Sequence, residues 1–219
     1  MNDSEKLKYQ IALSLVPAIG FVHAKRLMAA FGSAEAVLKA SKKDLQRVPN
    51  IGEFIAQKVV SCNVLDKAEQ EVEFIEKHRI SYAFYTDKNY PKRLKRCVDA
   101  PLVLFWKGNI DFNAEKMVAI VGTRNATNYG REFCDALISE MAAHGGYSVV
   151  SGLAYGIDVA AHKASLKQGV PTLGVLGHGL DMIYPTLHKQ VAVKMLKDGG
   201  LVTDFVSETS VERQNFLRR

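Results

Sequence analysis

The sequence predicts an α/β protein, with a helical N-terminal domain over residues 1–78 and a parallel-sheet domain over residues 79–219. Apolar residues recur at helical spacing as far as residue 78, whereas from residue 116 short apolar strands alternate with helices. Continuously apolar strands joined by helices are typical of a parallel sheet that is covered on both faces. The 219 residues, 47% hydrophobic and 24% charged, suffice for real buried cores and argue against a mainly disordered chain.

The first domain is predicted to consist of short helices with two similar breaks at residues 17–20 and 48–52. Ser33 and Ser41 can each cap a helix that follows, the second running from residue 42 to 48, because a serine hydroxyl accepts a hydrogen bond from an unpaired backbone N–H. A long helix over residues 63–78 closes the domain. The other helices are indicated by apolar residues on one face: Ile11, Leu15 and Val16; Ala24, Leu27 and Met28; Ala56, Val59 and Val60.

The two breaks form a near-repeat, Val-Pro-Ala-Ile-Gly-x-x-x-Ala at residues 16–24 and Val-Pro-Asn-Ile-Gly-x-x-x-Ala at residues 48–56. It resembles a tandem helix-hairpin-helix pair, as found in SAM-like helical domains. We expect the glycine to let each hairpin turn tightly, so that backbone N–H groups at the next helix can hold a phosphate oxygen. Lys25, Arg26 and Lys58 follow the hairpins. Helical protein-docking modules use the same turns for packing, so the repeat leaves DNA contact and protein contact both open.

The positive charge is concentrated in the first part of the chain. The net charge is +6, and residues 1–100 hold 17 Lys and Arg against 12 Asp and Glu. A basic surface attracts polyanions, nucleic acid first among them. A solvated charged loop explains the same pattern, so charge alone does not decide between the two. The densest run lies between two predicted strands, residues 82–85 and 102–106, and comprises Lys88, Lys92, Arg93, Lys95 and Arg96.

The second domain is predicted to alternate four strands with three helices. Ligands of such sheets bind beyond the carboxyl ends of the strands. The strands are expected at residues 117–121, 147–150, 172–176 and 201–205, and the helices at 129–143 (with Phe133, Leu137 and Met141 on one stripe), 157–167 and 187–196.

Three predicted strand ends carry glycines together with polar residues, at residues 121–127, 150–158 and 176–181. Glycine lets a ligand approach backbone N–H groups that can cradle a phosphate, and Arg124 offers a planar guanidinium suited to the same anion. One such turn needs glycine for steric reasons alone, but three at a common edge favour an anion pocket. The spacing matches neither a dinucleotide-binding nor a Walker A motif.

Asp158 and His162 lie four residues apart on one predicted helix and could pair. No nucleophile is placed beside them, so we expect Asp158 to complement the helix dipole and His162 to be a partly buried side chain. The separated cysteines Cys62, Cys97 and Cys134 favour reduced thiols and no zinc site. No stretch approaches the roughly 20 apolar residues of a membrane span, and the N-terminus has no signal-peptide pattern. A cytoplasmic location without a membrane partner is therefore expected.

The motifs, in this order, resemble the DNA-processing protein A family (DprA, also called Smf). The resemblance is carried by residues 120–130, 151–162 and 177–185, preceded by Tyr90-Pro91 and residues 101–108. It implies an N-terminal helical domain joined to an extended Rossmann-like domain. It further implies a dimeric binder of single-stranded DNA, not an enzyme and without cofactor or metal, which protects incoming DNA and loads the RecA recombinase during DNA uptake by competent cells, in natural transformation.

By position, the resemblance makes Arg124 the main phosphate contact and places Tyr155 where we infer that its ring stacks on a base. Three departures are Thr123, where Ser is more usual, His188 in place of Asn, and Leu217 in place of Pro. The chain stops soon after, so we expect a fragment or truncated product with an incomplete sheet. The nucleic-acid-binding residues implied are Gly122, Thr123, Arg124, Ser151, Gly152, Tyr155, Gly156, Gly177, Gly179 and Arg218.

A second interpretation is an enzyme on a related Rossmann-like scaffold that hydrolyses nucleoside monophosphates, as cytokinin-activating phosphoribohydrolases do. A pocket for a ribose phosphate would have similar geometry. Those enzymes carry a Pro-Gly-Gly-x-Gly-Thr loop with a downstream Glu, and this sequence has no such loop. A third interpretation makes the first 78 residues a protein-docking module only.

Overall fold

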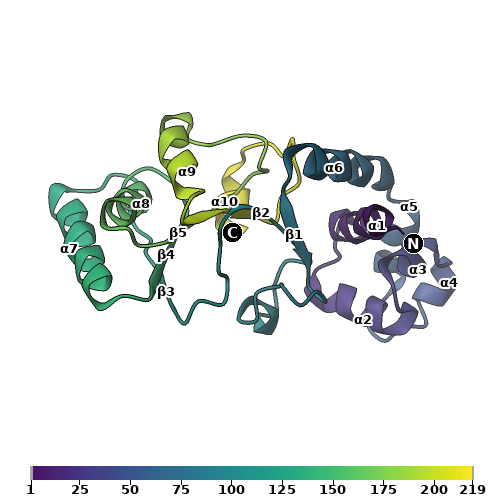
Figure 1. The fold of residues 1–219 in the computed structure, drawn as a ribbon. Coiled ribbons are helices and arrows are strands. Elements are labelled where there is room, and N and C mark those ends of the chain that lie inside the picture. The colour runs from purple at the N-terminus through teal and green to yellow at the C-terminus, as the bar shows by residue number, and fades with distance from the viewer. Residues whose placement is uncertain (1, 219) are drawn as a thin grey trace. The chain divides into compact units, whose positions relative to one another are not determined.

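The computed structural model describes residues 2–218, with Arg218 through its backbone only, and the chain forms two compact units (Figure 1). The boundary falls between Leu104 and Phe105. Within the described residues, no helix combines the length and the apolar character needed to cross a membrane.

The first unit begins with helices whose apolar faces meet in a common core. Ile11 on the first helix, Leu27 on the second and Leu45 on the fourth are fully buried. The first helix packs against the sixth, where Lys8 Nζ lies 2.9 Å from Glu69 Oε2. The helices are α1 (Asp3–Leu15), α2 (Phe21–Phe31), α3 (Ala34–Lys39), α4 (Lys42–Leu45), α5 (Glu53–Ser61) and α6 (Leu65–His78).

The serine caps predicted for α3 and α4 are confirmed. Ser33 Oγ accepts a hydrogen bond from the Ala36 N–H at 3.1 Å, and Ser41 Oγ accepts one from the Asp44 N–H at 3.2 Å. Helix α4 ends at Leu45, three residues before the predicted end. The chain reaches Val48 through i→i+3 turns instead, because a residue that precedes a proline is disfavoured in the α conformation.

The near-repeat folds into two hairpins with the same backbone geometry. In both, the isoleucine N–H donates to the carbonyl of the valine three residues earlier. The prediction that glycine makes the turn was wrong: the left-handed residues are Ala18 (φ 68°) and Asn50 (φ 65°). Gly20 and Gly52 instead have extended backbone at the N-caps of α2 and α5. Asparagine tolerates the left-handed region, so the second hairpin needs no glycine at its turn.

A segment with two strands follows α6. Strand β1 (Ser81–Phe84) and strand β2 (Val103–Gly108) flank a loop with one 3-10 turn, η1 (Leu94–Arg96). The Tyr90 hydroxyl donates to the Pro101 carbonyl at 2.6 Å and ties the two ends of this loop together. The five cations of the basic run are exposed on it.

The second unit alternates strands with helices as predicted. Strands β3, β4, β5 and β6 are parallel neighbours, and β2 pairs antiparallel with β6. The full strand order is β1-β2-β6-β5-β4-β3. The elements are β3 (Lys116–Ala119), α7 (Asn128–His144), β4 (Tyr147–Ser151), α8 (Ile157–Gln168), β5 (Thr172–Val175), η2 (Thr186–His188), α9 (Lys189–Met195), β6 (Gly199–Thr203) and α10 (Arg213–Arg218).

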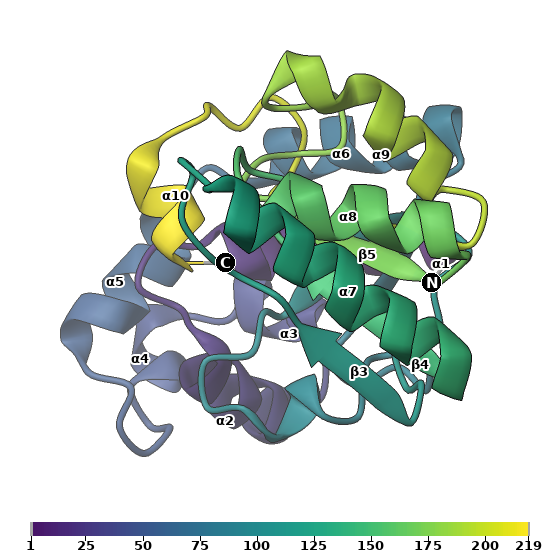
Figure 2. The ribbon, with the colours of Figure 1, turned by 90° about the vertical axis from the view of Figure 1, so that its left-hand side faces the viewer.

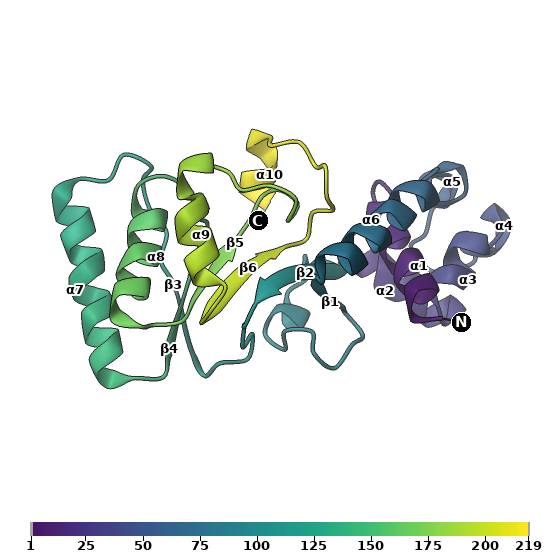
Figure 3. The ribbon, with the colours of Figure 1, turned by 45° about the horizontal axis from the view of Figure 1, so that its top comes forward.

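Helices α7, α8 and α9 lie on the same face of strands β3–β6, side by side in Figure 2 and Figure 3. The sequence had predicted helices on both faces. The difference follows from strand order: β3, β4, β5 and β6 succeed one another in one direction, and right-handed crossovers then place every connecting helix on one side.

The core of this unit lies between those helices and the sheet. One cluster, with Ile138, Val149 and Ala161 fully buried, lies under α7 and α8. A second, with Leu153, Leu176 and Met195, lies under α9. On α7 the buried positions are Cys134, Ile138 and Met141, whereas Phe133, which the sequence placed on the stripe of Leu137 and Met141, is 56% exposed.

Candidate nucleic-acid interface

The loops that follow β3, β4 and β5 meet at the carboxyl ends of these neighbouring strands. Together with α10 they form a pocket, called the Arg124 pocket below. Arg124, in the loop after β3, lies beside Gly152 and Tyr155 of the loop after β4, and the predicted anion pocket needs these two loops to be neighbours. The pocket is lined by Arg124, Gly152, Ala154, Tyr155, Tyr184, Pro185 and Phe216.

The Arg124 pocket combines one cation with three aromatic rings. Arg124 Cζ lies 5.8 Å from the centre of the Phe216 ring, a distance typical of a cation–π contact. The Tyr184 and Phe216 rings lie 5.9 Å apart with 38° between their planes. Tyr155 is 43% exposed and Tyr184 45% exposed, so both rings are accessible to a ligand. A guanidinium beside exposed rings suits a ligand with both a phosphate and a flat base.

Gly156 locks the loop after β4 against the loop after β3. Its φ is +78°, and a Cβ there would overlap the carbonyl groups of Thr123 and Arg124. The next residue, Ile157, donates its backbone N–H to the Thr123 carbonyl at 3.1 Å. A close approach of two backbones at a positive φ is possible only for glycine here, so this position fixes where Arg124 stands.

Buried polar side chains anchor each of the three loops. Ser151 Oγ donates to the Ile120 carbonyl at 2.6 Å, and Thr203 Oγ1 donates to the His178 carbonyl at 2.8 Å. Asp158 accepts from the Ala154 N–H at 3.4 Å. None of these side chains lines the pocket, and their hydrogen bonds hold the backbone of the loops that do.

Three of the residues proposed from the sequence, Arg124, Gly152 and Tyr155, line the pocket together. Gly177 lies directly behind it, because a Cβ there would come within 2.9 Å of the Phe216 ring. Gly179 lies elsewhere, against the backbone of residues 206 and 207.

The other proposed residues support the loops or lie outside what can be described. Gly122 packs against the Ile157 side chain, and Thr123 Oγ1 accepts from the Asn125 N–H at 3.2 Å. Ser151 and Gly156 act as described above. The side chain of Arg218 lies outside the described part of the chain.

Asp158 and His162, which the sequence places four residues apart on one helix, are both buried, so the expectation of a partly buried His162 was wrong. His162 is fully buried, and its Nδ1 lies 2.7 Å from Thr172 Oγ1. Neither residue lines the Arg124 pocket. Among the described residues, no group of three His, Cys, Asp or Glu side chains is placed to bind a metal ion.

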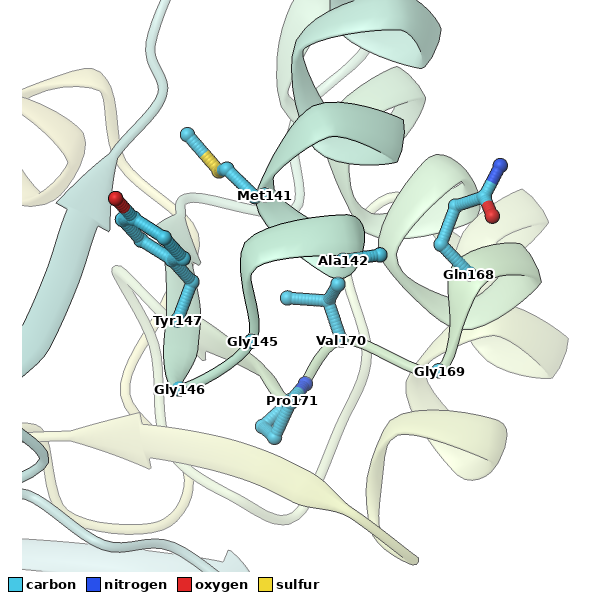
Figure 4. Close-up of a pocket in the computed structure, with 9 residues that line it drawn as sticks. All are labelled: Met141, Ala142, Gly145, Gly146, Tyr147, Gln168, Gly169, Val170 and Pro171. Atoms are coloured by element: carbon cyan, nitrogen blue, oxygen red, sulfur yellow. The ribbon is translucent and has the colours of Figure 1, made fainter.

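A second hollow lies at the other end of the sheet, where α7 and α8 end and β4 and β5 begin (Figure 4). Its lining includes Met141, Tyr147, Val170 and Pro171, together with the turns at Gly145 and Gly169, and no charged side chain. The absence of a cation from this lining makes the Arg124 pocket the stronger candidate for an anionic ligand.

Comparison with known proteins decides the family. The family model "DNA recombination-mediator protein A" matches residues 81–219. The chain belongs to this family. A helix-hairpin-helix motif model matches residues 10–69, in agreement with the near-repeat.

Two curated relatives match 100% and 61% of the chain. Protein Smf of Synechocystis sp. is 33% identical over 227 residues, covering 100% of this chain and 56% of that protein. The DNA processing protein DprA of Bacillus subtilis is 38% identical over 135 residues, covering 61% of this chain and 45% of that protein. The chain therefore spans about half the length of the curated relatives it matches.

Solved structures of DprA proteins share the fold. DprA of Streptococcus pneumoniae superposes on 100% of this chain and 73% of its own with a TM-score of 0.73, at 22% identity. DNA processing protein A of Helicobacter pylori, whose structure describes a single-stranded DNA binding mode, covers 64% of this chain and 61% of its own with a TM-score of 0.56, at 28% identity.

For this DprA-family chain, the sequence interpretation missed four residues of the pocket: Ala154, Tyr184, Pro185 and Phe216. Three of them stand within the segments that carried the family resemblance, so the signal was present but unassigned. Phe216 is 92 residues from Arg124 in the chain, and only the fold brings α10 to this edge of the sheet.

Proposed function

We propose that this chain binds single-stranded DNA in the Arg124 pocket and acts as a recombination mediator that protects incoming DNA and loads the RecA recombinase during natural transformation. Membership of the family and the DNA-binding H. pylori relative support the proposal. It includes a cytoplasmic location, a homodimer in the full-length form, and binding rather than catalysis.

The observation that carries the proposal is the combination of Arg124 with the rings of Tyr155, Tyr184 and Phe216 around one pocket. The guanidinium can pair with a phosphate, and the rings can stack on bases. Every base has a π face, so a site of this kind binds single strands with little sequence preference. Paired bases in a duplex offer no free face, so we expect duplex DNA to bind more weakly.

The test is the binding of fluorescently labelled oligo-dT at several salt concentrations. For each phosphate contact, the logarithm of the association constant falls by about 0.7 per tenfold rise in salt. Replacing Arg124 by Ala should weaken binding of all sequences alike and reduce that slope by about one contact. Lys167→Ala, which removes an exposed cation from the far end of α8, is the matched control and should bind as the unchanged protein does. Equal loss in both variants, or equal affinity for duplex and single strand, contradicts the proposal.

Loading of RecA is tested separately, on oligo-dT covered by a single-strand-binding protein. We expect this chain to shorten the lag before RecA begins DNA-dependent ATP hydrolysis. With the Arg124→Ala variant, the lag should be as long as in the absence of this chain. Incubation with AMP tests for hydrolysis; release of free adenine would contradict a function limited to binding.

The helical unit is proposed as a second DNA contact. Glycine is the N-cap of both α2 and α5, which follow the two hairpins, and neither helix has a side-chain N-cap hydrogen bond. Arg26, which is exposed, and Lys58, which is half-buried, occupy equivalent positions six residues after these glycines. The double variant Arg26→Ala and Lys58→Ala should weaken DNA binding if the hairpins touch DNA. Unchanged affinity would favour protein docking instead.

A further inference from the structure

Two buried histidines lie behind the Arg124 pocket without lining it. His178 is 1% exposed and His188 is 6% exposed. His178 Nδ1 lies 2.8 Å from the Gly179 carbonyl oxygen, and His188 Nδ1 lies 2.8 Å from the Leu153 carbonyl oxygen. A carbonyl oxygen only accepts, so each Nδ1 carries the proton.

His178 also contacts the segment that presents Tyr184 to the pocket. Its Nε2 lies 3.3 Å from the Tyr184 backbone nitrogen, whose N–H only donates. Nε2 must therefore accept this hydrogen bond through its lone pair, which means that Nε2 carries no proton. The ring is then the Nδ1–H tautomer. One imidazole thus bridges the Gly179 carbonyl and the Tyr184 N–H, and fixes the loop between them.

His188 instead contacts the other pocket tyrosine through its ring. The rings of His188 and Tyr155 lie 5.1 Å apart with 69° between their planes, an edge-to-face arrangement. While Nδ1 of His188 is bonded to the Leu153 carbonyl, the ring cannot turn away from Tyr155. An asparagine at this position could keep the bond to Leu153 but would offer no ring.

We propose that His178 and His188 are positioning residues, which hold Tyr184 and Tyr155 in the orientation that stacks on DNA bases. The proposal rests on the function proposed above, since it takes a base as the ligand of the pocket. Neither histidine touches the DNA itself. They order two half-exposed tyrosine rings before the ligand binds, and this reduces the conformational entropy that the protein loses on binding.

The first test uses the protein without DNA, so that it does not depend on the proposed function. Long-range ¹H–¹⁵N NMR spectra should show His178 as the Nδ1–H tautomer. Gln can accept from the Tyr184 N–H in place of Nε2, whereas Asn can replace only Nδ1. Exchange of the Tyr184 amide proton should therefore stay slow in His178→Gln and become fast in His178→Asn. An Nε2–H tautomer, or equal protection in both variants, would overturn the role of His178.

His188 is tested in the same way through Tyr155. In His188→Asn the Tyr155 ring protons should lose the ring-current shift that a neighbouring imidazole causes, while His188→Phe should keep a ring-current shift. His144→Asn is the control, because His144 also bonds through Nδ1 to a carbonyl, that of Glu140, but lies at the end of α7 far from the pocket. Unchanged Tyr155 shifts in His188→Asn would overturn the role of His188.

The second test adds oligo-dT containing 2-aminopurine, a base whose fluorescence is quenched by stacking. We expect His178→Asn and His188→Asn to bind about tenfold more weakly than the unchanged protein, because one stacking ring is no longer held in place, and to quench less. His178→Gln and His144→Asn should quench as the unchanged protein does. Normal quenching in both Asn variants contradicts the proposal, whereas no binding by the unchanged protein contradicts the proposed function alone.

Discussion

Gly156 is the residue on which the geometry of the Arg124 pocket depends most directly. Its φ of +78° is strained for any other residue, and a Cβ would overlap the backbone of the loop that carries Arg124. Other loop positions tolerate a side chain far better. Gly52, with φ −77° and nothing within 4 Å of an added Cβ, is one of them.

We therefore expect Gly156→Ala to destabilise the protein by more than the 1 kcal/mol or so typical of glycine replaced at a positive φ, because two loops must also move apart. Gly52→Ala should change stability by about 0.5 kcal/mol or less. Chemical denaturation of both variants measures the difference. Equal midpoints for the two would show that the loops after β3 and β4 are not locked together at Gly156.

At the scale of residues, the sequence predicted the centre of the pocket but not its wall. Arg124 and Tyr155 stand out because a cation and an aromatic ring next to glycines at strand ends are rarely needed for packing. Ser151 has the same sequence context but a structural role, since burial turns its hydroxyl to the Ile120 carbonyl. Phe216 is an ordinary apolar residue in sequence, and its role depends on where α10 packs, which no local pattern encodes.

At the scale of elements, α7 is the helix most directly coupled to the pocket, because its N-terminus follows the Arg124 loop. Thr127 caps this helix: its Oγ1 accepts from the Gly130 N–H at 3.1 Å. Thr127→Ala should reduce stability by about 1 kcal/mol, as loss of a helix N-cap does, while Thr127→Ser should retain most of it. Thermal unfolding measures both. A Ser variant as unstable as the Ala variant would point to the lost methyl group, not to the cap.

Most elements were predicted within a few residues of their observed bounds, since each has a clear period and a capping or breaking residue at its ends. The failures have physical causes that are not local. Apolar strands indicate burial but do not say from which side, and only the order of β3 to β6 places α7, α8 and α9 on one face. Similarly, the hairpins contain glycine where the backbone is extended and turn at Ala18 and Asn50, so composition misplaced the turn.

At the scale of the whole molecule, the three thiols report on different parts of the chain. Cys97 is exposed, Cys62 is partly buried, and Cys134 lies on the buried face of α7. Burial, and to a lesser degree the nearby carboxylate of Asp135, raises the pKa of the Cys134 thiol. The folded protein therefore holds this proton more tightly than the unfolded chain does.

We expect alkylation to modify Cys97 first, Cys62 next, and Cys134 only when the second unit unfolds, as mass spectrometry of digested samples can show. The stabilising contribution of the neutral Cys134 thiol is complete below its unfolded pKa and is lost as pH rises through the folded value. Stability of the second unit should thus decline in alkaline solution, and Cys134→Ala should flatten this decline. Labelling of Cys134 as fast as Cys97 in native buffer would contradict the buried position.

Strand β3, whose loop bears Arg124, lies at the margin of the sheet, with β4 as its strand neighbour among the described residues. A DNA strand bound at the edge of the sheet can extend past the protein in both directions. Binding then does not require a free 5′ or 3′ end. Covalently closed circular single-stranded DNA should accordingly compete with labelled oligo-dT as well as a linear strand of equal length does. If only linear DNA competes, the binding site is not open to a continuous strand at the β3 edge of the sheet.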